Sequence, residues 1–283
     1  VGTDDGNLQC TNDGGHKWTN VASNLSASGV PAHAWVSSIF PSQHDRNVVY
    51  VTLENHMYGD HQTYAVRSSD MGKTWTRLQS NEFTGFAHKI VEDPSNPKLL
   101  FLGTEMGLFC SLDGGMNWFR MKNKIPEYAL VRDIQIHPKT HDLIIATHGR
   151  GIYILDDIRP LYNLNSSVAE KEAYVFPTPD IVLNNGRFGW GGPEVSGGWY
   201  CGNAEEKPSI TYYLKERLNS GKATVDILDD KGTLVQTFPA TIRKGINKVE
   251  WNLRGVPPRV ATGSTKMDGA GFTAPMVLPG TYT

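Results

Sequence analysis

An octapeptide that occurs three times constrains the fold of this 283-residue chain more than any other feature. Each copy has Ser or Thr at its first position, Asp at its third, Gly at its fifth and Trp at its last. The copies are TNDGGHKW from Thr11, SSDMGKTW from Ser68 and SLDGGMNW from Ser111. The separations between the three copies along the chain are typical of a repeated unit of about four strands. The sequence therefore predicts a repeat architecture.

The repeat extends beyond the octapeptide. A β-rich run precedes each copy, and upstream of these runs lies a shared element of isoleucine, proline, a polar turn and a hydrophobic strand, as in IFPSQHDRNVVYVT from Ile39. Each unit is then a meander of four strands, with the octapeptide as the turn between the third and the fourth. Residues 34–80, 86–122 and 130–157 form three such units, the last with a degenerate octapeptide, and residues 1–22 form an incomplete one.

Four-stranded units of this kind are the blades of β-propellers, which close with about four to eight blades. We therefore expect an all-β fold in which residues 1–157 form a partial propeller of three to four four-stranded blades. The remaining blades are expected from sequence outside these residues or from another chain, because three to four blades are too few to close. Since Val1 enters in the middle of a blade, the chain is expected to be a piece of a longer protein.

The second half divides into two parts. Residues 158–207 are rich in Pro and Gly and predict an irregular connector, in which Trp190, Trp199 and Tyr200 either pin the connector to a neighbouring surface, which we favour, or form a strip for sugar rings. Residues 208–283 alternate again, with a hairpin signal around Asp229 to Gly232. An immunoglobulin- or fibronectin-like β-sandwich that lacks its last strand is the expectation for this segment.

Composition excludes several classes of function. The net charge of −2, without a cationic run, argues against nucleic acid as a partner, and no apolar stretch is long enough to predict a membrane span. The three cysteines are not arranged as CxxC, so no zinc knuckle is indicated, and we expect Cys10 and Cys110 to be unbonded because they occupy equivalent strands of non-adjacent units. No cofactor motif is present.

The octapeptide itself is expected to be structural. Its Asp can accept hydrogen bonds from its own turn, its Gly supplies a positive φ, and its Trp packs between strands. One carboxylate per copy is too few for a calcium site, which takes about six to eight oxygen ligands. The residues assigned this structural role are Asp13, Asp70, Asp113, Trp18, Trp75 and Trp118.

A ligand site is expected at the other end of the units. In a four-stranded meander, the turn between strands three and four lies opposite the loop between strands two and three and opposite the start of strand one. The polar and aromatic residues at those positions are Asp4, Asp5, Trp35, Glu54, His56, Asp60, His61, Glu105, Arg132, His148 and Arg150, with His33, His88 and Asp133 among the neighbouring segments. His56, Asp60 and His61 could bind a metal by residue type, but their spacing is not specific, and no metal is expected.

The three octapeptides resemble the Asp-box, or BNR, repeats of sialidases, sortilin-type receptors and xyloglucanase-type glycosidases. The run through GTEMGLFCSLDGGMNW and HDLIIATHGRGIYILDDIRPL is similar to the sortilin-like or glycosyl-hydrolase-like repeat proteins that bacteria secrete, and residues 208–283 resemble their Ig-like modules. This resemblance implies a secreted or cell-envelope protein whose propeller face binds a glycan or a peptide. The alternative is a glycoside hydrolase with paired carboxylates on that face, but not a sialidase, because no Arg-Ile-Pro element is present.

Overall fold

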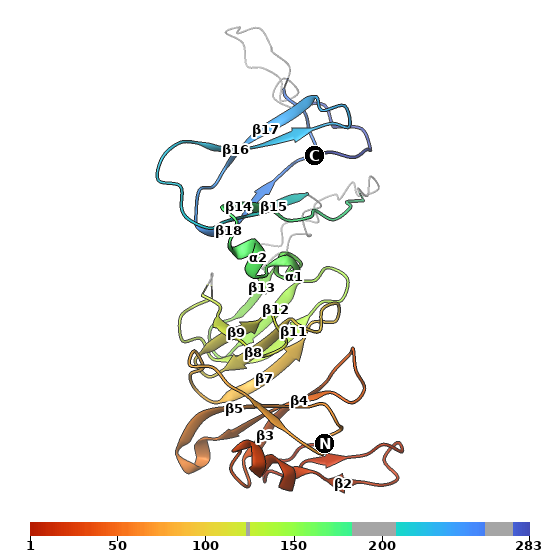
Figure 1. Cartoon of the computed structure of the whole chain (residues 1–283), viewed down its shortest axis with the longest axis vertical. Coiled ribbons are helices and arrows are strands. Elements are labelled where there is room, and N and C mark those ends of the chain that lie inside the picture. The colour runs from red at the N-terminus through yellow and green to blue at the C-terminus, as the bar shows by residue number, and fades with distance from the viewer. Residues whose placement is uncertain (123–124, 183–207, 258–273) are drawn as a thin grey trace, which may run out of the picture. The chain divides into compact units, whose positions relative to one another are not determined.

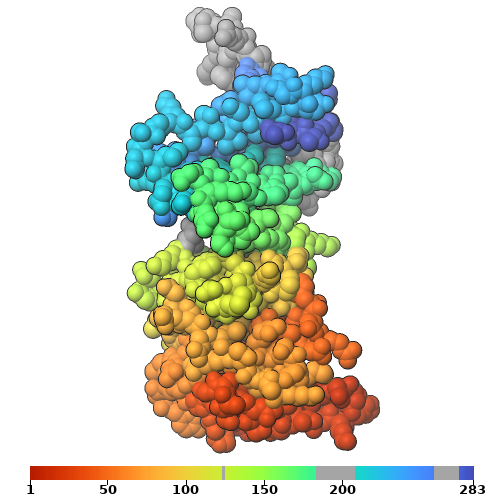
Figure 2. Space-filling view, in the orientation of Figure 1, coloured from red at the N-terminus to blue at the C-terminus, as the bar shows by residue number. Residues whose placement is uncertain are grey.

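The computed structural model of the chain describes residues 1–122, 125–182, 208–257 and 274–283. These residues form two compact units, Val1–Asn165 and Ser166–Thr283 (Figure 1). In the space-filling view, the surface coloured from red to yellow-green belongs to the first unit (Figure 2). Trp190, Trp199, Tyr200 and Cys201 lie outside the described residues, so the two interpretations of the aromatic strip both stay open.

The first unit consists of consecutive antiparallel sheets, as the repeat predicts. The first sheet pairs β1 (Gln9–Cys10) with β2 (Thr19–Asn20) and is extended by a bridge between Gly2 and Leu8. A 3₁₀ helix, η1 (Ala22–Ser28), follows. The second sheet is the meander of β3 (Trp35–Pro41), β4 (Val49–Asn55), β5 (Asp60–Ser68) and β6 (Thr76–Leu78), with the short η2 (His56–Tyr58) between β4 and β5.

The third and fourth sheets repeat this order. The third holds β7 (Ala87–Glu92), β8 (Leu100–Thr104), β9 (Gly107–Ser111) and β10 (Phe119–Arg120). The fourth holds β11 (Val131–Ile136), β12 (Leu143–Thr147) and β13 (Ile152–Leu155), and the helix α1 (Pro160–Asn163) follows. The all-β fold of consecutive blade-like sheets is thus the one that the sequence predicts.

Hydrophobic cores fill the spaces between successive sheets, because the middle strands are apolar on both sides. On β4, Val51 and Leu53 lie in the core shared with the first sheet, whereas Tyr50 lies in the core shared with the third. On β8, Leu102 faces the second sheet and Phe101 the fourth. Residues one apart point to opposite faces of a strand, so this alternation stacks each sheet against two neighbours.

The three octapeptides form one hydrogen-bonded turn. In SLDGGMNW, the backbone N–H of Asn117 donates to Oδ1 of Asp113 (2.9 Å), and the Ser111 hydroxyl donates to the same oxygen (2.8 Å). The N–H of Gly115, at φ 94°, donates to the Ser111 hydroxyl (2.9 Å). The corresponding bonds recur around Asp13 and Asp70. These turns satisfy several of their own polar groups.

The position of the octapeptide turns shows which end of the sheets they occupy. The N–H of Met71 donates to the carbonyl of Asn47 (3.0 Å), and the N–H of Gly114 donates to the carbonyl of Lys98 (2.8 Å). Asn47 and Lys98 belong to the turns between strands one and two of their sheets. The opposite end therefore carries the loop between strands two and three and the start of strand one.

The second unit is also built from antiparallel strands. After α2 (Ser166–Ala169), β14 (Ala173–Val175) pairs with β15 (Ser209–Leu214), which pairs with β18 (Gly245–Glu250). The hairpin expected around DDKG joins β16 (Ala223–Leu228) to β17 (Leu234–Ala240). Thr283 exchanges both of its backbone hydrogen bonds with Leu228 of β16.

Two further observations bear on the expectations from composition. Cys10 and Cys110 are both free thiols, as predicted from their places in non-adjacent units. Among the described residues, no helix is long and apolar enough to cross a membrane.

Candidate functional site

A β-bulge recurs in the first strand of the second, third and fourth sheets. The register shifts between Val36 and Ser38, between Ala87 and Lys89, and between Val131 and Asp133. The extra residues are therefore Ser37, His88 and Arg132. A bulge re-aims a side chain and is over-represented beside functional sites. The three bulges lie at the end opposite the octapeptides.

The extra residues contact the neighbouring sheets. The Ser37 hydroxyl donates to the carbonyl of Ala87 on the third sheet (2.8 Å), and Nη1 of Arg132 on the fourth sheet donates to Nδ1 of His88 on the third (2.9 Å). An arginine only donates, so Nδ1 of His88 is the acceptor and its proton is on Nε2. Three sheets thus contribute to one polar cluster.

Glu54, at the end of β4, is the acidic member of this cluster. Its carboxylate lies 3.5 Å from Nδ1 of His56 and 3.7 Å from Nδ1 of His88, and the residue is only 6% exposed. Burial raises the pKa of Glu54 above its usual value, and the charge of Glu105 adds to the increase, while His56 and Arg132 oppose it. The carboxyl is therefore easier to protonate than an ordinary glutamate.

The pKa of His88 is shifted in the direction expected for a buried base. Desolvation, followed by the positive charges of Arg132 and His56, lowers the pKa of His88 to about 4, so the imidazole is neutral at pH 7. Its Nε2–H, together with Oε2 of Glu54 and Nδ1 of His56, has no hydrogen-bond partner among the described residues although all three atoms are buried. Buried polar atoms are normally paired, so this group of unpaired atoms points to a ligand or water site.

Aromatic rings surround the polar cluster. The His56 ring stacks on Phe86 with centroids 4.6 Å apart, and the His88 ring meets the same phenylalanine edge-on at 5.0 Å. Trp35 pairs with Glu54 across β3 and β4, so the two side chains lie on the same face of the sheet. The indole of Trp35 is 44% exposed, which leaves a ring free beside the buried carboxyl.

The side chains of the other predicted residues differ in whether they are already hydrogen-bonded within their own loops. Asp60 accepts hydrogen bonds from the Tyr64 hydroxyl (2.7 Å) and from Asn55 (3.2 Å), so its carboxylate is engaged within its own loop. Asp5 is engaged in the same way by Thr3 and Asn7. His61 lies 6.1 Å from the Phe86 ring, at the edge of the cluster. The remaining exposed polar residues of this end, which lie away from the Glu54 contacts, are Asp4, His148 and Arg150.

Phe86 is the residue of the cluster that sequence reasoning missed. It is an apolar residue directly before the first strand of the third sheet, and nothing in its pattern separates it from core residues such as Ala87. The one signal was its position two residues before His88. Among the described residues, no group of three or more His, Cys, Asp or Glu side chains is placed to hold a metal ion.

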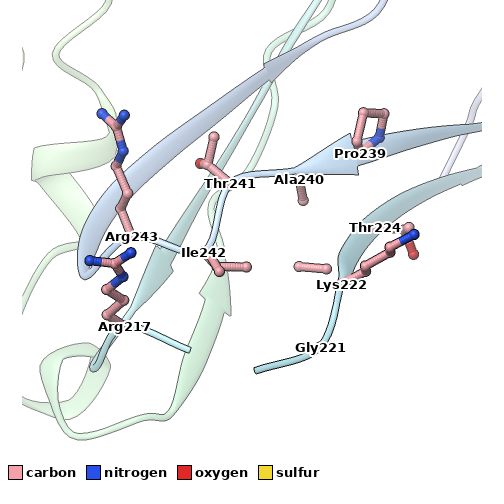
Figure 3. Close-up of a pocket in the computed structure, with 10 residues that line it drawn as sticks. Arg217, Gly221, Lys222, Thr224, Pro239, Ala240, Thr241, Ile242 and Arg243 are labelled. Atoms are coloured by element: carbon pink, nitrogen blue, oxygen red, sulfur yellow. The ribbon is translucent and has the colours of Figure 1, made fainter. Parts of the chain in front are cut away.

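The hollows in the described surface include the following two. One, of about 610 Å³, borders the cluster, and its lining includes His61, Thr63, Arg77 and Gly85. The other, of about 630 Å³, lies in the second unit at the open end of the β16–β17 hairpin, where Arg217, Ile242 and Arg243 line it (Figure 3). The first hollow is lined by none of the residues around Glu54. We define the site as Trp35, Glu54, His56, Phe86, His88 and Arg132, with Glu105 acting on its charge.

Comparison with known proteins gives likeness to structures alone. No family model matches the chain, and no curated protein matches it. A GH74 enzyme of Niastella koreensis aligns with 84% of this chain and 38% of its own, with 14% identity and a TM-score of 0.44. A GH74 xyloglucanase from Xanthomonas campestris aligns with 93% and 36%, with 12% identity and a TM-score of 0.43.

The structure of YCF48 bound to D1 peptide aligns over 56% of this chain and 47% of the YCF48 chain, with 15% identity and a TM-score of 0.40. This chain therefore spans less than half of the length of each of these three proteins.

Proposed function

We propose that this chain is part of a secreted or cell-envelope binding protein of the Asp-box type, and that its ligand is a glycan held at the candidate site. The single observation that carries the proposal is the group of buried polar atoms on Glu54, His56 and His88 that have no hydrogen-bond partner among the described residues. Sugar hydroxyls both donate and accept hydrogen bonds, so one hydroxylated ring can satisfy donors and acceptors together.

The arrangement of rings and charges supports a glycan over a peptide. Trp35 offers a half-exposed aromatic face beside Glu54, and ligand sites combine such apolar surface with a few placed polar groups. Arg132 is exposed, and apart from its bond to His88 no hydrogen bond or ion pair of its guanidinium is found within the described residues, so donors are left for a ligand. We further propose that residues 208–283 form the Ig-like module that the sequence predicts.

A screen for binding tests this function directly. The purified chain is applied to an array of neutral and uronate-bearing oligosaccharides and to a peptide library of matched size. We expect binding to oligosaccharides, weakened about two- to tenfold by Trp35→Ala, because a stacked ring contributes about 0.5 to 1.5 kcal/mol. Trp18→Ala is the matched control, since Trp18 is similarly exposed at 48% but lies in an octapeptide. Binding to peptides alone would overturn the glycan proposal.

A glycoside hydrolase is the second candidate, and one observation favours it. The pKa of Glu54 is raised by burial and by Glu105, and a carboxylic acid with a raised pKa is what a general acid requires. Release of reducing ends from a bound oligosaccharide, lost in Glu54→Gln while binding is kept, would support this activity. Binding without release from any bound oligosaccharide would leave the chain as a binding protein.

A further inference from the structure

The hollow of about 630 Å³ in the second unit is lined from two connections between successive strands. The first connection, residues 215–222, runs from β15 to β16, and the second, residues 241–244, runs from β17 to β18. The backbone N–H of Leu218 donates to the carbonyl of Ile242 (3.2 Å), so the two connections are held against each other.

The two connections carry five cationic side chains and one acidic side chain. Two of the cations are paired: Nζ of Lys244 lies 2.8 Å from Oε1 of Glu216, and Nζ of Lys215 lies 4.0 Å from Oε1 of Glu172. Within the described residues, no hydrogen bond or ion pair engages the side chains of the other three, which are Arg217, Lys222 and Arg243.

These three unpaired cations are also the ones that line the hollow (Figure 3). None of the ten described residues that line it is acidic. Like charges around one opening repel each other and create a positive potential there. The whole chain has a net charge of −2, so this positive potential is a local feature. The hollow therefore favours an anionic ligand.

The second connection is held in place by buried groups. The side-chain amide of the buried Asn247 donates to the carbonyls of Arg243 and Gly245 (both 2.8 Å), and its Oδ1 accepts from the Thr241 hydroxyl (2.6 Å). The hydroxyl of the buried Tyr212 donates to the Thr241 carbonyl (2.7 Å). The backbone that carries Arg243 is thus fixed, which lowers the entropic cost of binding a ligand.

The lining distinguishes among anions. Pro239, Ala240 and Ile242 give the hollow an aliphatic surface beside its cations. No aromatic ring lies among the ten described lining residues, so the bases of a nucleic acid would have no ring on which to stack. A guanidinium binds carboxylates and similar oxyanions through two parallel hydrogen bonds. A sugar ring that bears such a group can place its C–H groups on the aliphatic surface and its charge on the arginines.

We propose that the hollow of the second unit binds an acidic glycan. Arg217 and Arg243 hold the carboxylate or sulfate groups of this glycan, and Lys222 adds to the positive potential. The residues of this site belong to the second unit, whereas Glu54 and His88 belong to the first. The inference therefore goes beyond the proposed function and does not rest on it.

The test is a titration of the whole chain with a galacturonate oligomer by isothermal titration calorimetry. The methyl ester of the same oligomer is the matched neutral probe, and a sulfated oligomer and inorganic phosphate compare the kinds of oxyanion. We expect the acidic oligomer to bind at least about tenfold more tightly than its ester, because it adds charged hydrogen bonds. Its affinity is expected to fall as salt is added, because the cations are exposed.

Arg217→Gln/Arg243→Gln is expected to weaken binding of the acidic oligomer at least about tenfold. The melting temperature should stay unchanged, because both side chains are exposed and without a partner among the described residues. Lys231→Gln/Lys244→Gln is the matched control, since it removes two positive charges from the same unit but none from the hollow. Lys222→Gln, with a smaller expected loss, replaces the double variant if that variant unfolds.

Hydrogen exchange on the same samples locates the bound oligomer. We expect slower amide exchange in residues 215–222 and 241–244 when the acidic oligomer is added. Protection confined to the residues around Glu54 and His88 would overturn this inference while supporting the proposed function. Protection of the two connections, without binding of any neutral oligosaccharide, would support this inference and count against the candidate site as a site for neutral glycans.

Three further results would overturn the proposal. The first is equal affinity of the unsubstituted chain for the acidic oligomer and for its methyl ester. The second is equal affinity of Arg217→Gln/Arg243→Gln and its control for the acidic oligomer. The third is binding of inorganic phosphate as tight as that of the oligomers, which would show that the hollow recognises an oxyanion without the sugar.

Discussion

Arg132 and His88 come from different sheets, and Nη1 of Arg132 donates a hydrogen bond to Nδ1 of His88 across 2.9 Å. Both residues are the extra residues of β-bulges at the same place in their strands. The bond fixes the tautomer of His88 and leaves its buried Nε2–H without a partner among the described residues. A repeated backbone irregularity thus produces the polar cluster to which we assign ligand binding.

The protonation of His88 predicts a dependence of stability on pH. The native pKa of about 4 lies below the usual 6.5, so between these values the unfolded chain binds a proton that the native imidazole does not. Stability from this group is therefore full above pH 6.5 and is lost as the pH falls towards 4. Glu54, His56 and Arg132 face the same imidazole, and all three are kept both in the unsubstituted chain and in a variant that replaces His88.

We expect His88→Gln to lose less stability than the unsubstituted chain between pH 7 and pH 4.5, by about 1 to 3 kcal/mol. Urea unfolding at the two pH values measures the difference. Parallel losses in the two proteins would contradict the assignment of a buried neutral imidazole.

Asp113→Ala should destabilise the fold without affecting binding. The carboxylate accepts hydrogen bonds from the Asn117 and Met116 N–H groups and from Ser111, and these bonds, acting against burial, lower the pKa of Asp113. Their loss is expected to cost about 1 to 3 kcal/mol in urea unfolding. Asp13→Ala should cost less, because its octapeptide is more exposed. An unchanged unfolding midpoint with lost ligand binding would argue for a functional octapeptide.

Gly103→Ala should be costly because the third and fourth sheets approach closely there. A Cβ at this position would lie 2.7 Å from Cγ1 and 3.0 Å from the carbonyl oxygen of Val131. Overpacking of this kind costs about 1 to 3 kcal/mol. Gly255→Ala is the control, since its Cβ would meet nothing nearer than 3.8 Å. Equal thermal stability of the two variants would show that the sheets do not pack as described.

The two described cysteines should differ in reactivity. Burial raises the pKa of the Cys110 thiol well above its usual value, whereas Cys10 is half-buried. Thiolates are the reactive species, so Cys10 should be alkylated by iodoacetamide many times faster than Cys110 in the native protein. Peptide mass mapping after timed labelling measures both rates. A disulfide between them would be incompatible with the order of the sheets.

The sequence predicted the sheets because their signals are local. The octapeptide turn around Asp113 closes its own hydrogen bonds, and the alternation on β4 and β8 follows from residues one apart facing opposite cores. The same reasoning placed Glu54, His56 and Arg132 at one end of the sheets, because it depends only on the direction of the strands.

The cluster itself could not be predicted from the sequence, because it depends on bulges in the strands and on how neighbouring sheets pack against each other. The bulges that create extra residues at Ser37, His88 and Arg132 have no sequence signature of their own. The stacking of His56 on Phe86 joins the second sheet's loop to the segment before β7. Asp60 matches the pattern of a site residue, yet its bonds to Tyr64 and Asn55 tie it to its own loop.

The most direct test of the account is the affinity of two variants for an oligosaccharide identified on the array. By isothermal titration calorimetry, Arg132→Ala is expected to weaken binding at least about tenfold, since the loss of a charged hydrogen bond costs about 1.5 to 3 kcal/mol. Asp113→Ala is expected to keep the affinity and lower the melting temperature. The reverse pattern, with affinity lost in Asp113→Ala and kept in Arg132→Ala, would place the ligand at the octapeptide end and contradict the account.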